Sequence, residues 1–313
     1  AALADASCKV PAGSFHALLG ENGAGKSTLV KCIMGYYHPD DGAVLVDGRE
    51  REINNPKDAH RLGIGMVYQH FTLVPGMTVL ENLVMARPDV PAVIDWEKER
   101  AAVEAFLART PFKVPLDLPA ARLAAGEKQK VEILKQLYLD RQFLILDEPT
   151  SVLTPQEADE VLGLLRGMTQ EGRLTILMIT HKFREVMAFA DAVTVLRRGR
   201  VVGSGAVADL TAAQMAAMMV GSELPATGGG ERPPTTGKTV LEVKALVAEN
   251  DAGTTTVSNL SLAVRGGEIL GIAGVSGNGQ SQLIEVLAGQ RNPSSGNVAV
   301  HGEAYGARRA ESK

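Results

Sequence analysis

The sequence predicts an α/β fold with a mostly parallel core sheet. Three short apolar runs, at 15–19, 143–146 and 174–179, are typical of strands that are buried on both faces. They alternate along the chain with segments of helical pattern at 127–139 and 155–167. Such alternation indicates a parallel sheet that is covered by helices.

Two further helical stretches flank this pattern. The segment between Gln69 and Leu123 reads as a helical insertion, interrupted by a proline- and alanine-rich loop over 111–121. A helical pattern also covers 206–220. For the helices at 155–167 and 206–220, core packing is a better interpretation than a partner surface.

Composition excludes several classes of protein. The 313 residues carry a formal net charge of -4, so no global basic field points to nucleic acid, and we expect no such partner. The two cysteines lack paired or CxxC spacing, which indicates neither a disulfide framework nor a metal site. No apolar stretch reaches the roughly 20 residues that span a bilayer, so any membrane role would act through a partner.

An internal repeat divides the chain. Gly20 and Gly274 are 254 positions apart, and the same offset relates a series of other identical residues between 7–48 and 261–302. We therefore expect a first domain at 1–221, a flexible Gly/Pro/Thr-rich linker at 222–238 and the start of a second domain at 239–313. The opening strand of the first copy is expected upstream of Ala1, and the second copy is expected to be cut short.

A phosphate-binding loop follows the first apolar run. The nine residues match GxxxxGK[ST], between a strand pattern and a helix pattern: Gly20, Glu21, Asn22, Gly23, Ala24, Gly25, Lys26, Ser27 and Thr28. Glycines let backbone N–H groups face phosphate oxygens, and the helix N-terminus adds to the attraction. Lys26 would neutralise the β- and γ-phosphates of ATP, and Ser27 would ligate Mg²⁺.

The second copy contains a degenerate version of this loop. It keeps the loop glycines but has a glutamine in place of the lysine: Gly274, Gly277, Gly279, Gln280 and Ser281. A neutral amide cannot replace a point charge on the phosphates. We expect this loop to be a poor hydrolytic site, either binding nucleotide through its backbone or retained only as structure.

Polar residues with hydrolytic potential follow two of the strand patterns, and one more lies within 66–70. Asp147 is suited to a metal ion and Glu148 to polarising the attacking water. His181 could contact the γ-phosphate, and Gln69 could hold both Mg²⁺ and the water. The predicted metal ligands are therefore Ser27, Gln69 and Asp147.

In this order, the motifs resemble those of the ATP-binding subunits of ABC transporters, over nearly the whole chain. The phosphate loop resembles Walker A, 144–148 resembles Walker B, and 151–153 resembles the D-loop. Gln69 matches the Q-loop and His181 the switch histidine. The ABC signature, which distinguishes this family, is matched by Leu123, Ala124, Ala125, Gly126 and Glu127.

The resemblance implies a P-loop NTPase fold with antiparallel β elements and a helical subdomain, and pairing between the first and second ATPase domains. The resemblance is more specific to the tandem ATPases of simple-sugar and nucleoside importers, with nucleoside favoured. This narrower match rests on residues 66–82, residues 153–157 and the second loop. It further implies membrane permease subunits, a solute-binding protein that acts indirectly, and a peripheral location on the cytoplasmic face of a bacterial-type cell membrane.

Two departures from the family pattern matter. Ala124 stands where the family's serine donates a hydrogen bond to phosphate, and Gln280 stands where its lysine would be. In the family's head-to-tail pairing both would belong to one composite site, which leaves one active and one degenerate site. Because the active site would need a second signature beyond Lys313, we expect this chain to bind MgATP but to hydrolyse it weakly.

Two other functions remain open at this point. One is a soluble tandem ABC ATPase that acts on ribosomes or DNA; Gln280 and the short linker count against it. The other is a non-hydrolysing, nucleotide-gated scaffold, which Ala124 and Gln280 suggest and the intact Lys26, Glu148 and His181 oppose.

Overall fold

The computed structural model describes residues 2–221, 237–251, 253–274 and 278–305. By its internal contacts the chain divides into two compact units, Ala1–Ala226 and Thr227–Lys313. Most of the predicted linker, 222–236, lies outside the described residues.

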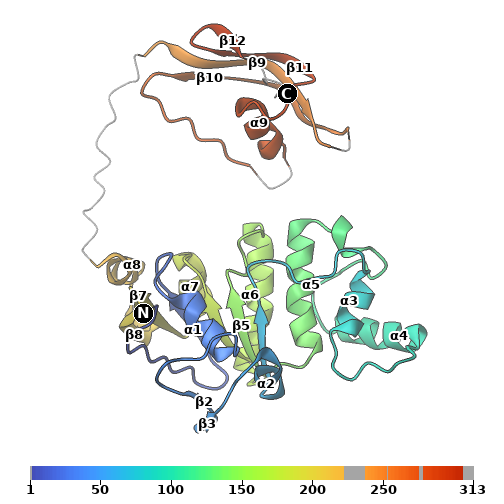
Figure 1. The fold of residues 1–313 in the computed structure, drawn as a ribbon, viewed down its shortest axis with the longest axis vertical. Coiled ribbons are helices and arrows are strands. Elements are labelled where there is room, and N and C mark those ends of the chain that lie inside the picture. Colours follow the sequence, from blue (N-terminus) through green and yellow to red (C-terminus); the bar gives the residue numbers. More distant parts are fainter. Residues whose placement is uncertain (1, 222–236, 252, 275–277, 306–313) are drawn as a thin grey trace. The chain divides into compact units, whose positions relative to one another are not determined.

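The first unit is built on one six-stranded sheet (Figure 1). Its order is β4 (Ile64–Val67), β5 (Phe143–Asp147), β6 (Thr175–Ile179), β1 (Phe15–Leu19), β7 (Ala192–Arg197) and β8 (Arg200–Ala206). The first five strands in this order run parallel, and β8 pairs with β7 antiparallel at the edge. The predicted mostly parallel sheet is therefore confirmed.

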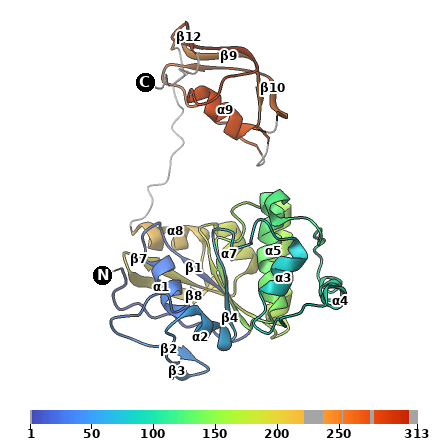
Figure 2. The ribbon, with the colours of Figure 1, turned by 45° about the vertical axis from the view of Figure 1, so that its right-hand side comes forward.

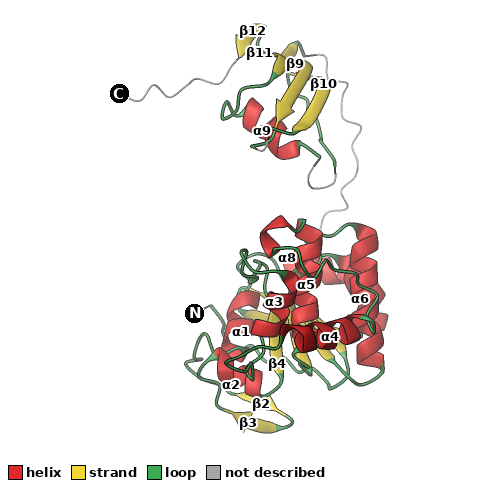
Figure 3. Ribbon diagram, turned by 90° about the vertical axis from the view of Figure 1, so that its right-hand side faces the viewer, coloured by secondary structure: helices red, strands yellow, loops and turns green. Residues whose placement is uncertain are grey.

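Helices cover both faces of this sheet, which Figure 3 shows in red around the yellow strands. They are α1 (Lys26–Ile33), α2 (Pro56–Arg61), α3 (Val79–Met85), α4 (Trp96–Leu107), α5 (Ala125–Tyr138), α6 (Pro155–Gln170), α7 (Phe183–Phe189) and α8 (Ala212–Val220). Alternation along β5 explains the two layers. Leu144 and Leu146 pack in the cluster that contains α5 and α6, whereas Ile145 packs with α1 and α2.

The expected helical subdomain is α3 and α4 beside α5 (Figure 2). The loop over 111–121 contains no strand or α-helix, and a short 3-10 turn, Ala120–Arg122, ends it. A small hairpin of β2 (Val44–Val46) and β3 (Arg49–Arg51) follows α1.

One predicted helix is wrong in its start. The pattern at 206–220 is α-helical only from Ala212, because β8 extends to Ala206, a 3-10 turn covers Val207–Asp209, and Thr211 forms a capping box with Gln214. Ala206, the first residue of the predicted helix, pairs with Ala192 of β7.

The second unit is a four-stranded antiparallel sheet with one helix. The strand order is β10 (Thr255–Arg265), β9 (Thr239–Glu249), β11 (Ser295–Val300) and β12 (Glu303–Tyr305), and α9 is Gln280–Leu287. Seven buried residues, among them Leu246, Leu283 and Val298, make a small core of its own.

The repeat is visible in the backbone as well as in the sequence. Helix α9 starts and ends at the positions that the offset of 254 gives from α1. Gly25 and Gly279 begin these helices with left-handed φ values of 106° and 89°. Since only glycine adopts such a conformation cheaply, the repeat preserves the glycine that precedes each helix.

Candidate functional site

The Walker A loop lies between the buried strand β1 and helix α1, near the middle of the sheet. A Cβ atom on Gly20 would collide with the backbone oxygen of Leu196, and one on Gly25 would lie 2.8 Å from the side chain of Leu3. The first N–H groups of a helix have no partner within it. The glycines thus leave this loop able to surround an anion with backbone donors.

Lys26 is the first residue of α1 and is only 9% exposed. Its Nζ donates hydrogen bonds to the carbonyl oxygens of Gly20, at 2.6 Å, and Glu21, at 3.0 Å. Burial lowers the pKa of Lys26, while the carboxylates of Glu148 and Asp147 act in the opposite direction. The ammonium group is therefore held across the loop and faces two carboxylates.

Asp147 and Glu148 are placed by the carboxyl end of β5. Burial, followed by repulsion from Glu148, raises the pKa of Asp147, and attraction to Lys26 partly offsets this. Two neighbouring acids beside one ammonium leave excess negative charge, which is a setting that suits a divalent cation. Ser27, exposed in the first turn of α1, adds a hydroxyl oxygen of the kind that Mg²⁺ accepts.

The raised pKa of Asp147 predicts a trade-off between stability and binding. A carboxyl whose folded pKa is raised costs stability at neutral pH, and that cost disappears as the pH falls through the folded pKa. Asp147→Asn should therefore raise the melting temperature in metal-free buffer at pH 7.5, with a smaller gain at acidic pH. It should also weaken Mg²⁺-dependent ATP binding at least about tenfold.

Differential scanning fluorimetry over a pH series checks the first part, with the exposed Asp209→Asn as the control variant. A lower melting temperature of Asp147→Asn at pH 7.5 would contradict the prediction.

Glu148 and His181 face each other across the ends of β5 and β6. The Nδ1 atom of His181 lies 3.0 Å from Oε1 of Glu148. Glu148 has a φ of 48°, uncommon for a residue other than glycine, and its N–H donates to the carbonyl of Ile179. Strained backbone of this kind costs about 1–3 kcal/mol and occurs mostly at functional sites.

A buried carboxylate, Glu185 on α7, joins the loops that carry these two residues. It accepts a hydrogen bond from Oγ1 of Thr150, at 2.7 Å, and lies 3.3 Å from Nζ of Lys182. Lys182 also donates to the carbonyl of Thr150. Because Thr150 follows Glu148 and Lys182 follows His181, this network fixes the two loops against each other.

Gln69 is exposed just after β4, which lies next to β5 in the sheet. The signature residues lie apart from the phosphate loop, at the start of α5. Leu123 is buried, Ala124 is exposed, and a Cβ on Gly126 would meet Glu157 and Leu153 at the start of α6. No hydrogen bond or ion pair joins the signature to the Walker A loop among the residues described in this unit.

The signature departs from the family at the N-cap of α5. The Ala124 N–H donates to the Glu127 carboxylate, at 2.8 Å, which is one half of a capping box. The other half needs a side-chain acceptor at Ala124, and alanine has none. The backbone of Ala124 nevertheless has the extended conformation of an N-cap residue, with φ −63° and ψ 158°.

Ala124→Ser should complete this cap. We expect the free energy of unfolding to rise by about 1 kcal/mol and the melting temperature by about 2–4 °C. Ala125→Ser, one residue inside the helix, is the matched control and should give no gain. Equal melting temperatures for the two variants would show that the cap contributes nothing.

In the second unit, Gly279 and Ser281 occupy the same places around α9 as Gly25 and Ser27 around α1. The Gln280 amide packs against Gly274, so that a Cβ there would collide with it. Gly277 lies outside the described residues. The side chain at the position of Lys26 is therefore a neutral amide that contacts Gly274.

The family model described as "ABC transporter" matches residues 3–151 and 257–313, which include both loops. The chain belongs to the ABC transporter family.

Several curated relatives are similar over nearly the whole of this ABC chain. A glucose import ATP-binding protein of Haloferax volcanii is 44% identical over 94% of the chain and 58% of its own length. A nucleoside import ATP-binding protein of Lactococcus lactis is 40% identical over 92% and 57%. A guanosine import ATP-binding protein of Bacillus subtilis is 41% identical over 94% and 58%. The chain thus spans somewhat more than half the length of these relatives.

Solved structures of the family match the fold. The protein cbiO1 of Clostridium perfringens, part of an ABC transporter complex, gives a TM-score of 0.59 at 30% identity, over 72% of this chain and 89% of that one. An ATP binding subunit of an ABC transporter gives 0.59 at 28% identity, over 70% and 92%. The predicted P-loop NTPase fold of the ABC type is therefore confirmed.

Sequence reasoning missed two buried acids, Glu185 and Glu132. Glu185 is 2% exposed and Glu132 is 1% exposed. A signal for Glu132 was available, because it interrupts the otherwise apolar run from Val131 to Leu134 on α5. An acid at such a position is rarely buried without a partner.

Proposed function

We propose that this chain is the ATP-binding and ATP-hydrolysing part of an ABC importer that powers uptake of a nucleoside or simple sugar. The main support is the P-loop lysine, Lys26, which faces the carboxylates of Asp147 and Glu148. The chain is also 40–44% identical to glucose, nucleoside and guanosine import ATP-binding proteins. None of the described helices is both long and apolar enough to cross a bilayer. A separate permease would therefore carry the solute.

The phosphates of ATP would lie on the Walker A loop. Backbone N–H groups of Gly23 to Thr28 and the N-terminus of α1 would bind the oxygens. Lys26 would exchange its two carbonyl partners for the β- and γ-phosphates, while the nearby carboxylates keep it protonated. Glu21, Asn22 and Ala24 would contribute through the loop backbone.

Ser27, Gln69 and Asp147 would hold Mg²⁺, which when bound neutralises charge on the β- and γ-phosphates. The excess negative charge between Asp147 and Glu148 suits such an ion. Glu148 would orient and deprotonate the attacking water. His181, 3.0 Å from Glu148, would hold that carboxylate in place and face the γ-phosphate.

The active site would be completed by a signature from a second ATPase domain paired with the first. The first signature, with Ala124, would face the second loop, with Gln280, so both weakened elements would share one degenerate site. Alternating pairing and release of the domains would drive the permease through the helical insertion of α3 and α4.

The partners in this proposal are permease subunits and, indirectly, a solute-binding protein, with the chain bound peripherally at the cytoplasmic face of the membrane. No nucleic acid is expected, given the formal net charge of -4. The solute is assigned only to the class of nucleosides and simple sugars.

The test is purification of the intact protein from native membranes in mild detergent, with mass spectrometry of the polypeptides that co-purify. A polytopic membrane protein in stable ratio would support the importer. A protein recovered free of membranes, or on ribosomes, would refute the transport function while leaving the ATP site to be tested by nucleotide binding.

A further inference from the structure

A buried acid on the signature helix contacts the segment that carries Gln69. Glu132 on α5 accepts hydrogen bonds from the backbone N–H of Thr72 and, at 3.0 Å, from that of Leu73. The Thr72 hydroxyl donates to the same carboxylate, at 3.0 and 2.9 Å. A carboxylate that accepts backbone N–H bonds forms strong, charge-assisted contacts.

Lys135, one turn further along α5, completes this cluster. Its Nζ lies 2.7 Å from Oε2 of Glu132 and 2.6 Å from Oγ1 of Thr72. The side chain of Lys135 is 12% exposed. The acid is therefore both paired in charge and saturated with donors, and all of these bonds converge on two residues of one loop.

This loop runs from Tyr68 to Val74, between β4 and α3, and is held at both ends. At its start, the Tyr68 hydroxyl lies 2.8 Å from that of Tyr36, which follows α1. At its end, Glu132 binds Thr72 and Leu73. Gln69 lies between the two anchors, three residues before Thr72.

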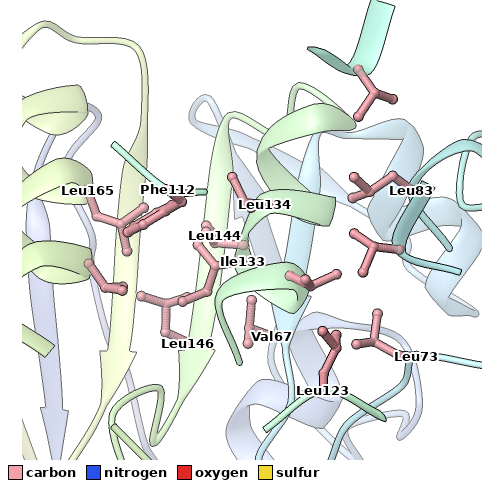
Figure 4. Packing of buried hydrophobic residues seen from close by; sticks show 14 of the residues in the cluster. Val67, Leu73, Leu83, Phe112, Leu123, Ile133, Leu134, Leu144, Leu146 and Leu165 are labelled. Carbon is pink, nitrogen blue, oxygen red and sulfur yellow. The ribbon is translucent and has the colours of Figure 1, made fainter. Parts of the chain in front are cut away.

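The second anchor belongs to the same packing unit as the signature. Leu73 and Leu123 are members of one apolar cluster, both labelled in Figure 4, together with Ile133 and Leu134 of α5. A displacement of α5 would thus move Thr72 and Leu73 with it, because packed interiors transmit strain.

We propose that Glu132 is a positioning residue that sets Gln69 for Mg²⁺ ligation and couples that ligand to the signature helix. The inference rests on the proposed function, since it requires MgATP at the Walker A loop. It assigns to Glu132 a role in the Mg²⁺-dependent part of ATP affinity, distinct from the part that Lys26 and the loop backbone supply.

The test measures dissociation constants of a fluorescent ATP analogue in Mg²⁺ and in EDTA, and compares their ratio between variants. For Glu132→Gln we expect the Mg²⁺ enhancement to fall about fivefold or more, towards that of Gln69→Ala. Affinity in EDTA should stay within about twofold. Combining Gln69→Ala with Glu132→Gln should cause no further loss, because both act through one ligand.

The matched control is Glu99→Gln. Glu99 is also a buried acid of the helical subdomain, paired with Arg87 at 2.6 Å, and no bond joins it to the described loop 68–74. The Glu99→Gln variant should have a lower melting temperature but an unchanged Mg²⁺ enhancement of ATP affinity. Thr72→Val removes only the hydroxyl contacts and should lower the Mg²⁺ enhancement by a smaller factor. It replaces Glu132→Gln in the test if that variant does not fold.

An unchanged Mg²⁺ enhancement in both Glu132→Gln and Thr72→Val would overturn the inference, as would additive losses in the double variant. Those results leave the ATP site intact, so they are distinguishable from failure of the proposed function. If the unmodified protein instead bound no analogue in either buffer, the proposed ATP site would fail, and the role of Glu132 with it.

Discussion

Lys26→Gln should lower the affinity of this chain for MgATP about 100-fold. The change gives the first loop the residue that the second loop carries at Gln280. An amide keeps the length and hydrogen-bonding ability of the side chain but removes its charge. Lys26 donates to two loop carbonyls and is attracted to both carboxylates, so its charge is set at the centre of the loop.

Equilibrium binding of a fluorescent ATP analogue measures this effect, and circular dichroism checks that the variant is folded. Lys98→Gln, at an exposed position of α4, is the control for loss of a positive charge. If Lys26→Gln bound MgATP as tightly as the unmodified chain, the loop would not be the nucleotide site. Gln280 would then also give no reason to expect weak nucleotide binding at the second loop.

Glu148→Gln should separate binding from hydrolysis. The amide cannot accept the proton of the attacking water, so we expect turnover to fall by about 100-fold or more, with MgATP affinity within about threefold of the unmodified value. The exchange keeps the shape of the side chain and its position beside His181. The variant should therefore fold normally.

Release of labelled phosphate under single-turnover conditions gives the required sensitivity, because we expect hydrolysis to be slow unless a second signature completes the site. Glu171→Gln, at an exposed position after α6, is a control acid. Fast turnover by the chain, abolished in Glu148→Gln, would show that the first unit does not need the signature of a partner domain. Turnover that survives Glu148→Gln would remove Glu148 from its proposed role.

Much of the site can be read from the sequence because its pieces are local. The Walker A loop depends on glycines at fixed spacing between one strand and one helix, and β1 and α1 occur where the pattern predicts them. Asp147 likewise ends a strand whose apolar run is unmistakable. Such motifs are determined within a few residues, so neighbours in sequence suffice to predict them.

Contacts between distant segments were not predictable in this way. Glu132 and Thr72 are 60 residues apart, and the network of Glu185 joins two separate loops. Each acid is buried only because packing of α5 or α7 brings donors to it. A single sequence shows an acid in an apolar stretch but not which donors will surround it.

The two copies of the repeat differ where structure depends on contacts between distant segments. Residues 15–19 form β1, whereas residues 269–273, their counterparts, form no strand, and Ile269 is 80% exposed. Strand β1 is paired on both sides, with β6 and β7, whereas residues 269–273 pair with none of the described strands.

The hairpins of the two copies also differ in the strands with which they pair. Strands β2 and β3 form a sheet of only two strands, while β11 and β12 join β9 in a sheet of four. Local sequence alone determined the phosphate loops, the helices that follow them and the turns, since these need only near neighbours. Tertiary structure decided which apolar runs became strands, because a strand is stable only when another backbone satisfies its N–H and C=O groups.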